Sequence, residues 1–209
     1  MATRTKPRSA AEPSPRVEFR PLTADRFFDL EALFGERGAC GGCWCMWWRL
    51  ARAEFNRQKG AGNRRAMKRI VDSGEVPGIL AYAGGAPVGW CCIGPRERFS
   101  ALERSRVLAR VDDRPVWSIV CFFVAKPWRH RGITPKLIEA ATEHARREGA
   151  RIVEGYPVVP RKGEMPAPFA FMGLPSAFLK AGFSEVLRRS EIRPILRIET
   201  GRRKARAPR

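Results

Sequence analysis

One stretch of the sequence, residues 116–158, constrains the fold more than any other. Residues 116–124 are apolar except for Ser118, which is the pattern of a strand at the centre of a sheet. After a turn, residues 135–148 carry apolar side chains at helical spacing, and residues 151–158 return to a strand pattern. A strand, a helix and a second strand in this order form a βαβ unit. The chain should therefore build a mixed sheet with helices on both sides.

The remaining elements follow from the same periodicities and from turn residues. Thr23 is a fitting N-cap for a helix over 24–34. Thr134 is an equivalent cap for the helix after the turn, with Pro135 at its first position. The expected strands cover residues 17–22, 78–83, 87–93, 116–124, 151–158, 185–190 and 194–199, and the further helices cover 63–73 and 174–181, with 96–110 helical in part.

Both ends of the chain differ from its middle. Residues 1–16 are rich in proline and basic residues, and residues 201–209 are almost purely basic. Neither segment has enough apolar surface to offset the entropy lost on ordering, so we expect two disordered basic tails. Residues 17–200 are then expected to form a single domain.

The net charge of +19 favours polyanionic partners such as nucleic acid, an anionic membrane or a phosphorylated cofactor. No apolar run approaches the roughly 20 residues that span a bilayer, and the N-terminus has no apolar core of a secretory signal. We therefore expect a cytoplasmic protein without a membrane partner, whose six cysteines are mostly reduced. The basic tails keep a nucleic-acid-binding protein open as an alternative. Because no helix-turn-helix pattern accompanies them, a nucleic-acid partner is not expected.

The turn between the central strand and the following helix has the composition of an anion site. Arg129, His130, Arg131, Gly132, Ile133 and Thr134 place backbone N–H groups, two guanidinium groups and a flexible glycine at the start of a helix. Such a turn suits a pyrophosphate. The local chemistry alone is also compatible with a plain strand-to-helix turn whose arginines are solvated.

Residues 124–138 resemble the coenzyme A signature of the GNAT superfamily of N-acetyltransferases. Arg129 and Gly132 match that signature, whereas Thr134 departs from its small final residue. A second stretch, Phe178-Leu179-Lys180-Ala181-Gly182-Phe183, resembles the end of the last helix of the family. The order of the expected elements also agrees, so the resemblance covers about residues 17–200.

The resemblance implies an α/β (α+β) fold with a mainly antiparallel sheet of six to seven strands, flanked by helices and splayed between its fourth and fifth strands. It implies acetyl-CoA as cosubstrate and a primary amine as acceptor, acylated by direct attack. The backbone of Phe122, Phe123 and Val124 would hold the pantetheine arm, and the Phe122 N–H would polarise the thioester carbonyl. Amides from His130 to Thr134 would hold the pyrophosphate. A homodimer is common among such folds, and nothing in the chain proves one.

Two positions that carry catalytic residues in many family members are filled differently here. Phe178 stands where a Tyr is usual and is assigned to the cofactor's surroundings, and Ser118 stands in place of a Glu. The candidate substitutes are Glu154, Tyr156 and Ser176. Ordinary roles stay open for all three: an ion-paired carboxylate, a packed aromatic ring and a helix-start serine. A catalytically inactive acyl-CoA-binding regulatory protein is therefore the main alternative function.

The segment Cys40-Gly41-Gly42-Cys43-Trp44-Cys45 has a spacing seen in zinc sites and in redox dithiols. A closed zinc site needs four ligands, and no second Cys-x-x-Cys follows, so no metal is expected. The favoured interpretation is a packing segment, because Trp44, Trp47 and Trp48 lie in or next to it. These tryptophans could also form an aromatic wall for the acceptor.

Overall fold

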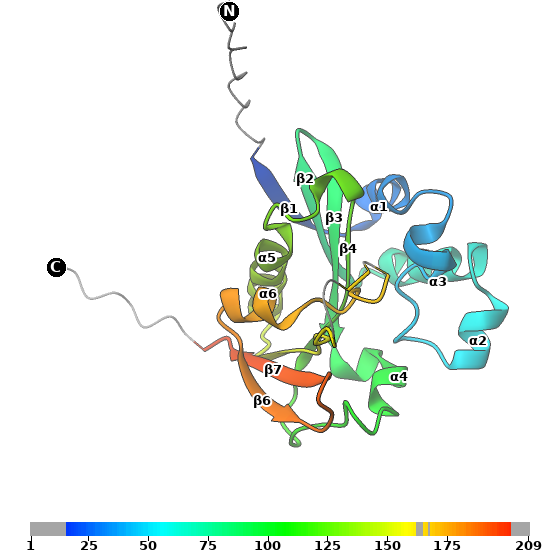
Figure 1. The fold of residues 1–209 in the computed structure, drawn as a ribbon. Helices are drawn as coiled ribbons and strands as arrows, with labels where there is room; N and C mark the ends of the chain where they lie inside the picture. The colour runs from blue at the N-terminus through cyan, green and yellow to red at the C-terminus, as the bar shows by residue number, and fades with distance from the viewer. Residues whose placement is uncertain (1–15, 162–164, 167, 202–209) are drawn as a thin grey trace, which may run out of the picture.

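The computed structural model describes residues 16–161, 165–166 and 168–201. Its centre is a seven-stranded sheet with the order β1-β2-β3-β4-β5-β7-β6 (Figure 1). The strands are β1 (Val17–Pro21), β2 (Gly78–Ala83), β3 (Ala86–Pro95), β4 (Trp117–Val124), β5 (Ile152–Gly155), β6 (Ser184–Arg188) and β7 (Pro194–Glu199). The parts of the predicted tails beyond Arg16 and Gly201 lie outside the described residues.

The strand pairing confirms the predicted mixed sheet. Strands β1 to β4 pair antiparallel in chain order, and Gly84-Gly85 turns β2 into β3 with both glycines at positive φ. The βαβ unit makes β4 and β5 parallel neighbours. β5 then pairs antiparallel with β7, and β7 with β6.

Helices cover both faces of the sheet, each with its own apolar core. On one face lie α1 (Phe27–Phe34), α2 (Arg52–Arg57), α3 (Ala61–Asp72) and α4 (Ser100–Glu103). On the other face lie α5 (Ile133–Arg147) and α6 (Pro175–Lys180), as Figure 1 shows. Short turns of helix lie at η1 (Ala24–Arg26), η3 (Arg96–Arg98) and η4 (Lys126–Trp128), and a turn with non-helical residues inside it lies at η2 (Gly38–Gly42).

Several predicted boundaries were wrong, for local reasons. α5 begins at Ile133 with Gly132 as its N-cap, so Thr134 is not the cap and Pro135 is the third helical residue. Proline is tolerated there because the N–H groups of the first turn have no helical partner. The expected helix 24–34 is split into η1 and α1, and the Thr23 side chain makes no capping bond.

Two further differences shape the site. α2 was not predicted, because its six residues show no clear apolar period. β5 ends at Gly155 rather than at residue 158, so Tyr156 follows the strand instead of lying within it. Within the described ranges, no helix combines the length and apolar character needed to cross a bilayer.

Candidate active site

β4 and β5 separate partway along their length. Their parallel pairing ends where Ile119 faces Gly155, while β4 continues to Val124. Against β3, the register jumps from the pair Cys92–Cys121 to the pair Ile93–Ile119, which leaves Val120 as an extra residue in β4. A bulge of this kind bends and twists a strand. The sheet is therefore split beside residues 120–124.

A returning segment, residues 168–174, lies along the split edge of β4. The backbone N–H of Phe122 donates to the carbonyl of Phe171 at 2.6 Å, and the N–H of Val158 donates to the carbonyl of Gly173 at 3.0 Å. The Phe178 ring lies next to Gly173 of this segment and packs against the Phe122 ring, with 5.9 Å between ring centroids. The amide predicted to face the thioester is thus paired within the chain.

The last carbonyl of β4 is also paired within the chain. The Arg129 side chain folds back so that its Nε donates to the carbonyl oxygen of Val124 at 3.0 Å. Phe122 is buried, while Phe123 and Val124 are half-buried. A ligand that runs along this edge of β4 must therefore exchange with existing hydrogen bonds rather than meet free backbone groups.

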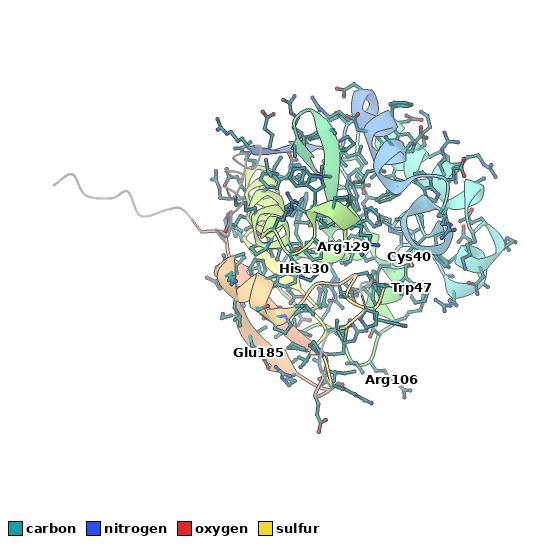
Figure 2. The ribbon with its side chains drawn as sticks, turned by 45° about the horizontal axis from the view of Figure 1, so that its top comes forward. Cys40, Trp47, Arg106, Arg129, His130 and Glu185 are labelled. Atoms are coloured by element: carbon teal, nitrogen blue, oxygen red, sulfur yellow. The ribbon has the colours of Figure 1, made fainter. Side chains whose placement is uncertain are left out.

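The turn between η4 and α5 has the backbone shape of an anion cradle. His130 and Gly132 both adopt left-handed conformations, with φ of 60° and 71°. Within the described chain, the N–H groups of His130, Arg131 and Gly132 donate to no backbone carbonyl. They precede the fifteen-residue helix α5, whose dipole adds partial positive charge (Figure 2).

The side chains of the turn add to this positive field. The Arg131 guanidinium lies 5.1 Å from the Trp128 ring centroid, and Arg129 and His130 lie between these two residues in the chain. A Cβ at Gly132 would meet no atom within 4 Å, so the backbone conformation and not lack of space favours glycine there. Unpaired amides with two guanidinium groups form a donor set that fits a pyrophosphate.

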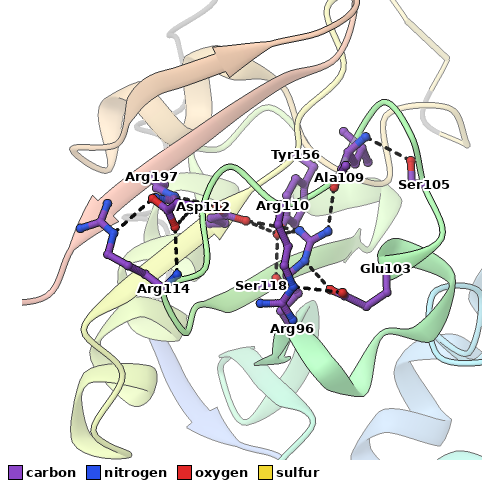
Figure 3. A network of polar contacts seen from close by, with 12 residues as sticks. Arg96, Glu103, Ser105, Ala109, Arg110, Asp112, Arg114, Ser118, Tyr156 and Arg197 are labelled. Atoms are coloured by element: carbon purple, nitrogen blue, oxygen red, sulfur yellow. Dashed lines mark hydrogen bonds and ion pairs between the residues drawn. The ribbon is translucent and has the colours of Figure 1, made fainter.

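Glu154 and Tyr156 meet in a buried polar network, in which Figure 3 labels Tyr156, Ser118, Arg96 and Arg197. The Tyr156 hydroxyl donates to Glu154 Oε2 at 2.5 Å and lies 2.7 Å from Ser118 Oγ. Arg197 Nε donates to Glu154 Oε1 at 2.6 Å, and Arg96 Nη1 donates to the Tyr156 oxygen at 2.9 Å. The structure thus brings together two predicted catalytic residues and the serine that replaces the usual Glu.

This network is closed to solvent. Ser118 and Tyr156 are 0% exposed, and Glu154 and Arg96 are 1% exposed. Burial and the charge of Glu154 hold the pKa of the Tyr156 hydroxyl well above its usual range, so it keeps its proton at neutral pH. Glu154 is paired with two guanidinium groups, an arrangement that favours structural ion pairing over proton transfer.

The outer ends of both arginines are also bound. Arg197 forms a two-pronged contact with Asp112, at 2.6 and 3.0 Å. Arg96 donates to Glu103 and to the carbonyl of Leu108. The network therefore connects β4, β5 and β7 to residues 96–112, the segment that contains Arg96, Glu103, Leu108 and Asp112.

The third predicted catalytic residue lies apart from this network. Ser176 is exposed on α6 and makes no side-chain hydrogen bond with the described residues. Phe178, two residues on, is fully buried, and its ring nearly touches the backbone of Gly155.

The Cys-Trp segment, residues 40–48, lies against β3 and β4. Buried Cys45 places its sulfur 3.4 Å from that of Cys121, and Trp90 Nε1 donates to Cys45 at 3.0 Å. Trp44 packs on Phe34, which in turn packs edge-on against Phe123. Among the described residues, no group of three or more His, Cys, Asp or Glu is arranged to hold a metal ion.

Sequence reasoning missed three participants in the site. Arg197 carried a readable signal, because an arginine inside an apolar strand needs a buried acidic partner. Arg96 lay unmarked within a basic segment, and the carbonyl of Phe171 is a backbone group that no residue pattern indicates.

A mixed sheet split between β4 and β5, with a turn of unpaired backbone amides leading from β4 into α5, is the architecture of acyl-coenzyme A-dependent transferases. The sequence model of the Acetyltransferase (GNAT) family matches residues 44–159, more than half of the chain. The chain therefore belongs to the GNAT family. It is accordingly an N-acetyltransferase that uses acetyl-CoA.

Solved structures of GNAT acetyltransferases share the fold at low sequence identity. One from Streptococcus agalactiae is 9% identical, with a TM-score of 0.53 and coverage of 89% of this chain and 96% of its own. One from Streptococcus pneumoniae is 12% identical, with a TM-score of 0.50 and coverage of 89% and 100%. A GNAT family protein from Desulfovibrio desulfuricans is 16% identical, with a TM-score of 0.50 and coverage of 88% and 99%. No curated protein sequence matches the chain.

Proposed function

We propose that this enzyme transfers the acetyl group of acetyl-CoA directly to a primary amine, with the coenzyme held between the split edge of β4 and the turn before α5. The observation that carries the proposal is the pair of left-handed residues, His130 and Gly132, that leave backbone N–H groups unpaired at the start of α5. These amides lie at the positive end of the α5 dipole and beside two arginine guanidinium groups. They therefore suit the two phosphates of the coenzyme's pyrophosphate.

In this proposal the backbone amides from His130 to Thr134 bind the pyrophosphate. Arg129 and Arg131 contribute charge at its rim. The Arg129 guanidinium has a second role, because its Nε already binds the carbonyl of Val124. It joins the phosphate turn to the strand that receives the pantetheine arm.

The thioester end requires an exchange of hydrogen bonds. The Phe122 N–H leaves the carbonyl of Phe171 and turns to the thioester carbonyl oxygen, where it stabilises the negative charge that develops during attack. Phe123 and Val124 offer the next backbone groups to the pantetheine arm. Phe178 lines the floor of the split and keeps water from it.

We infer that Glu154 and Tyr156 act as a scaffold. Glu154 has two guanidinium partners and Tyr156 keeps its proton, so neither is poised to accept a proton from the amine. Ser176 is the remaining candidate for donating a proton to the departing thiolate, since it is exposed on α6, two residues before Phe178. The cytoplasmic location and the homodimer stay predictions.

The binding site is tested by calorimetry with acetyl-CoA. We expect micromolar binding to the intact protein, and loss of binding in Arg129→Ala combined with Gly132→Asp. The matched control is Arg146→Ala with Gly149→Asp, at the other end of the same helix, where the glycine is again at positive φ with open space around it. Equal loss in both double variants would contradict the site, and so would unchanged binding in the first.

A regulatory protein that binds acyl-CoA without turnover is the second candidate, favoured by Phe178 and Ser118 at the usual catalytic positions. Release of free coenzyme A thiol, followed over a panel of primary amines, separates the two. Acceptor-dependent release supports the enzyme. Tight binding with release no faster than in buffer across the panel supports the regulatory role.

A further inference from the structure

Four of the six cysteines converge on one face of the sheet, and acetyl transfer uses none of them. Cys43 and Cys45 come from the Cys-Trp segment, Cys92 from β3 and Cys121 from β4. The sulfurs of Cys45 and Cys121 lie 3.4 Å apart, and Cys43 and Cys92 are the other thiols close enough to Cys45 to shift its pKa. Cys45 is thus the centre of a cluster of thiols that are far apart in the sequence.

The outer thiol, Cys43, is half-buried and is the member of the cluster nearest to solvent. The Cys43 Sγ donates to the carbonyl oxygen of Gly38 at 3.7 Å, and its surroundings, the neighbouring Cys45 thiol first among them, lower the pKa of Cys43 to about 6. Trp44 and Cys45 hold positive φ values of 44° and 56°. Residues other than glycine rarely adopt this left-handed backbone conformation, and those that do cluster at functional sites.

Two of the inner thiols, Cys45 and Cys121, have the opposite character. Contact with Cys121, Cys43 and Cys92, together with burial, raises the pKa of Cys45 well above the usual range. Contact with Cys45 lowers the pKa of Cys121, but burial and the neighbouring thiols Cys43 and Cys92 outweigh it, so the pKa of Cys121 is also raised. Both are buried, and Trp90 Nε1 donates to the Cys45 sulfur at 3.0 Å. The half-buried, easily ionised Cys43 is thus followed by the protonated thiol of Cys45, which touches the sulfur of Cys121. A reactive cysteine followed by two resolving cysteines is arranged in this order.

We propose that this cluster is a site of oxidative modification, in which a hydroperoxide oxidises Cys43 and the oxidation passes through Cys45 to end as a Cys45–Cys121 disulfide. In the first step the Cys43 thiolate attacks the peroxide O–O bond, forming Cys43 sulfenic acid and releasing hydroxide from hydrogen peroxide. The sulfur loses two electrons and the peroxide gains them.

In the second step the Cys45 sulfur attacks the Cys43 sulfur. The S–O bond breaks, and the Cys45 proton leaves with the hydroxyl as water. In the third step the Cys121 thiol gives its proton to the hydroxide released in the first step and its sulfur attacks Cys45; the Cys43–Cys45 bond breaks, and Cys43 departs as the thiolate that began the sequence. Two thiols and one hydrogen peroxide thus give one disulfide and two waters.

The resulting disulfide would join the Cys-Trp segment to β4, one residue before Phe122. This chemistry does not depend on acetyl transfer, and its test measures sulfur oxidation alone. Failure of the thiol proposal therefore leaves the proposed function untouched.

The full chain is titrated with hydrogen peroxide, with dimedone present to trap sulfenic acid, and is mapped by peptide mass spectrometry without reduction. We expect a Cys45–Cys121 disulfide in the unmodified protein and a dimedone adduct on Cys43 in Cys45→Ser. In Cys43→Ser the disulfide should form at least tenfold more slowly. Cys40→Ser is the matched control, because Cys40 is an exposed thiol of the same segment (Figure 2).

Cys91 is an internal control, since it is buried in the core on the opposite face of the sheet. It should stay free throughout the titration. A Cys40–Cys43 disulfide as the main product would overturn the proposal, and so would equal rates in Cys43→Ser and the unmodified protein. The map of the unmodified protein decides the matter even if a serine variant fails to fold.

Discussion

Replacing Glu154 by Gln distinguishes a structural role of Glu154 from a role as the catalytic base. The substitution keeps the size of the side chain but removes the charge that faces Arg197 at 2.6 Å and Arg96 at 3.4 Å. Breaking one side of a buried ion pair costs about 3–5 kcal/mol. Because Arg197 keeps Asp112 and Arg96 keeps Glu103, we expect the lower end, ~3 kcal/mol. For a domain of this size, that loss lowers the Tm by about 6–12 °C.

The assay is thermal and urea unfolding followed by circular dichroism. Glu185→Gln is the matched control, because Glu185 is exposed and pairs with Arg188 at the surface, where such pairs contribute roughly 0–1 kcal/mol. A Glu154→Gln protein as stable as the control, with turnover reduced by roughly 10²–10⁴ as for loss of a general base, would refute the scaffold role.

Three further predictions concern backbone geometry and thiol chemistry. His130→Val should destabilise the cofactor turn by about 1–2 kcal/mol and weaken acetyl-CoA binding in calorimetry, because His130 has a φ of 60°, whereas His130→Gly should retain binding. Gly155→Ala should lower stability by about 1–3 kcal/mol in urea unfolding, because its Cβ would lie 2.0 Å from Phe178 Cε1, while Gly201→Ala, with open space, should change stability little. Since the pKa of Cys43 is lowered, its thiolate forms as pH rises through about 6, and its alkylation by iodoacetamide should show that midpoint. A midpoint near 8.5, the ordinary thiol value, would contradict the contacts assigned to Cys43.

The fold was largely predictable because its signals are local and periodic. The apolar run of β4, the Gly84-Gly85 hairpin and the amphipathic α5 each specify an element without reference to distant residues. The start of α5 was misplaced because Gly132 caps the helix through its backbone conformation, which leaves no side-chain signature, whereas Thr134 carries the side chain that caps prefer.

The candidate site was predictable only where it depends on one continuous segment. The turn from Arg129 to Thr134 could be proposed from the sequence because the groups that would bind an anion are consecutive. The partners of Glu154 could not, since Arg96 and Arg197 lie 58 and 43 residues away and reach it through the tertiary fold. The pairing of Phe122 with Phe171 was equally hidden, because any residue type supplies a backbone carbonyl.

A crystal structure of the protein with coenzyme A tests the central claim most directly. We predict that the pyrophosphate oxygens lie about 2.7–3.2 Å from backbone nitrogens between His130 and Thr134. We also predict that the Phe122 N–H has left the carbonyl of Phe171. Coenzyme bound elsewhere, or bound while the Phe122–Phe171 hydrogen bond stays intact, would contradict this account.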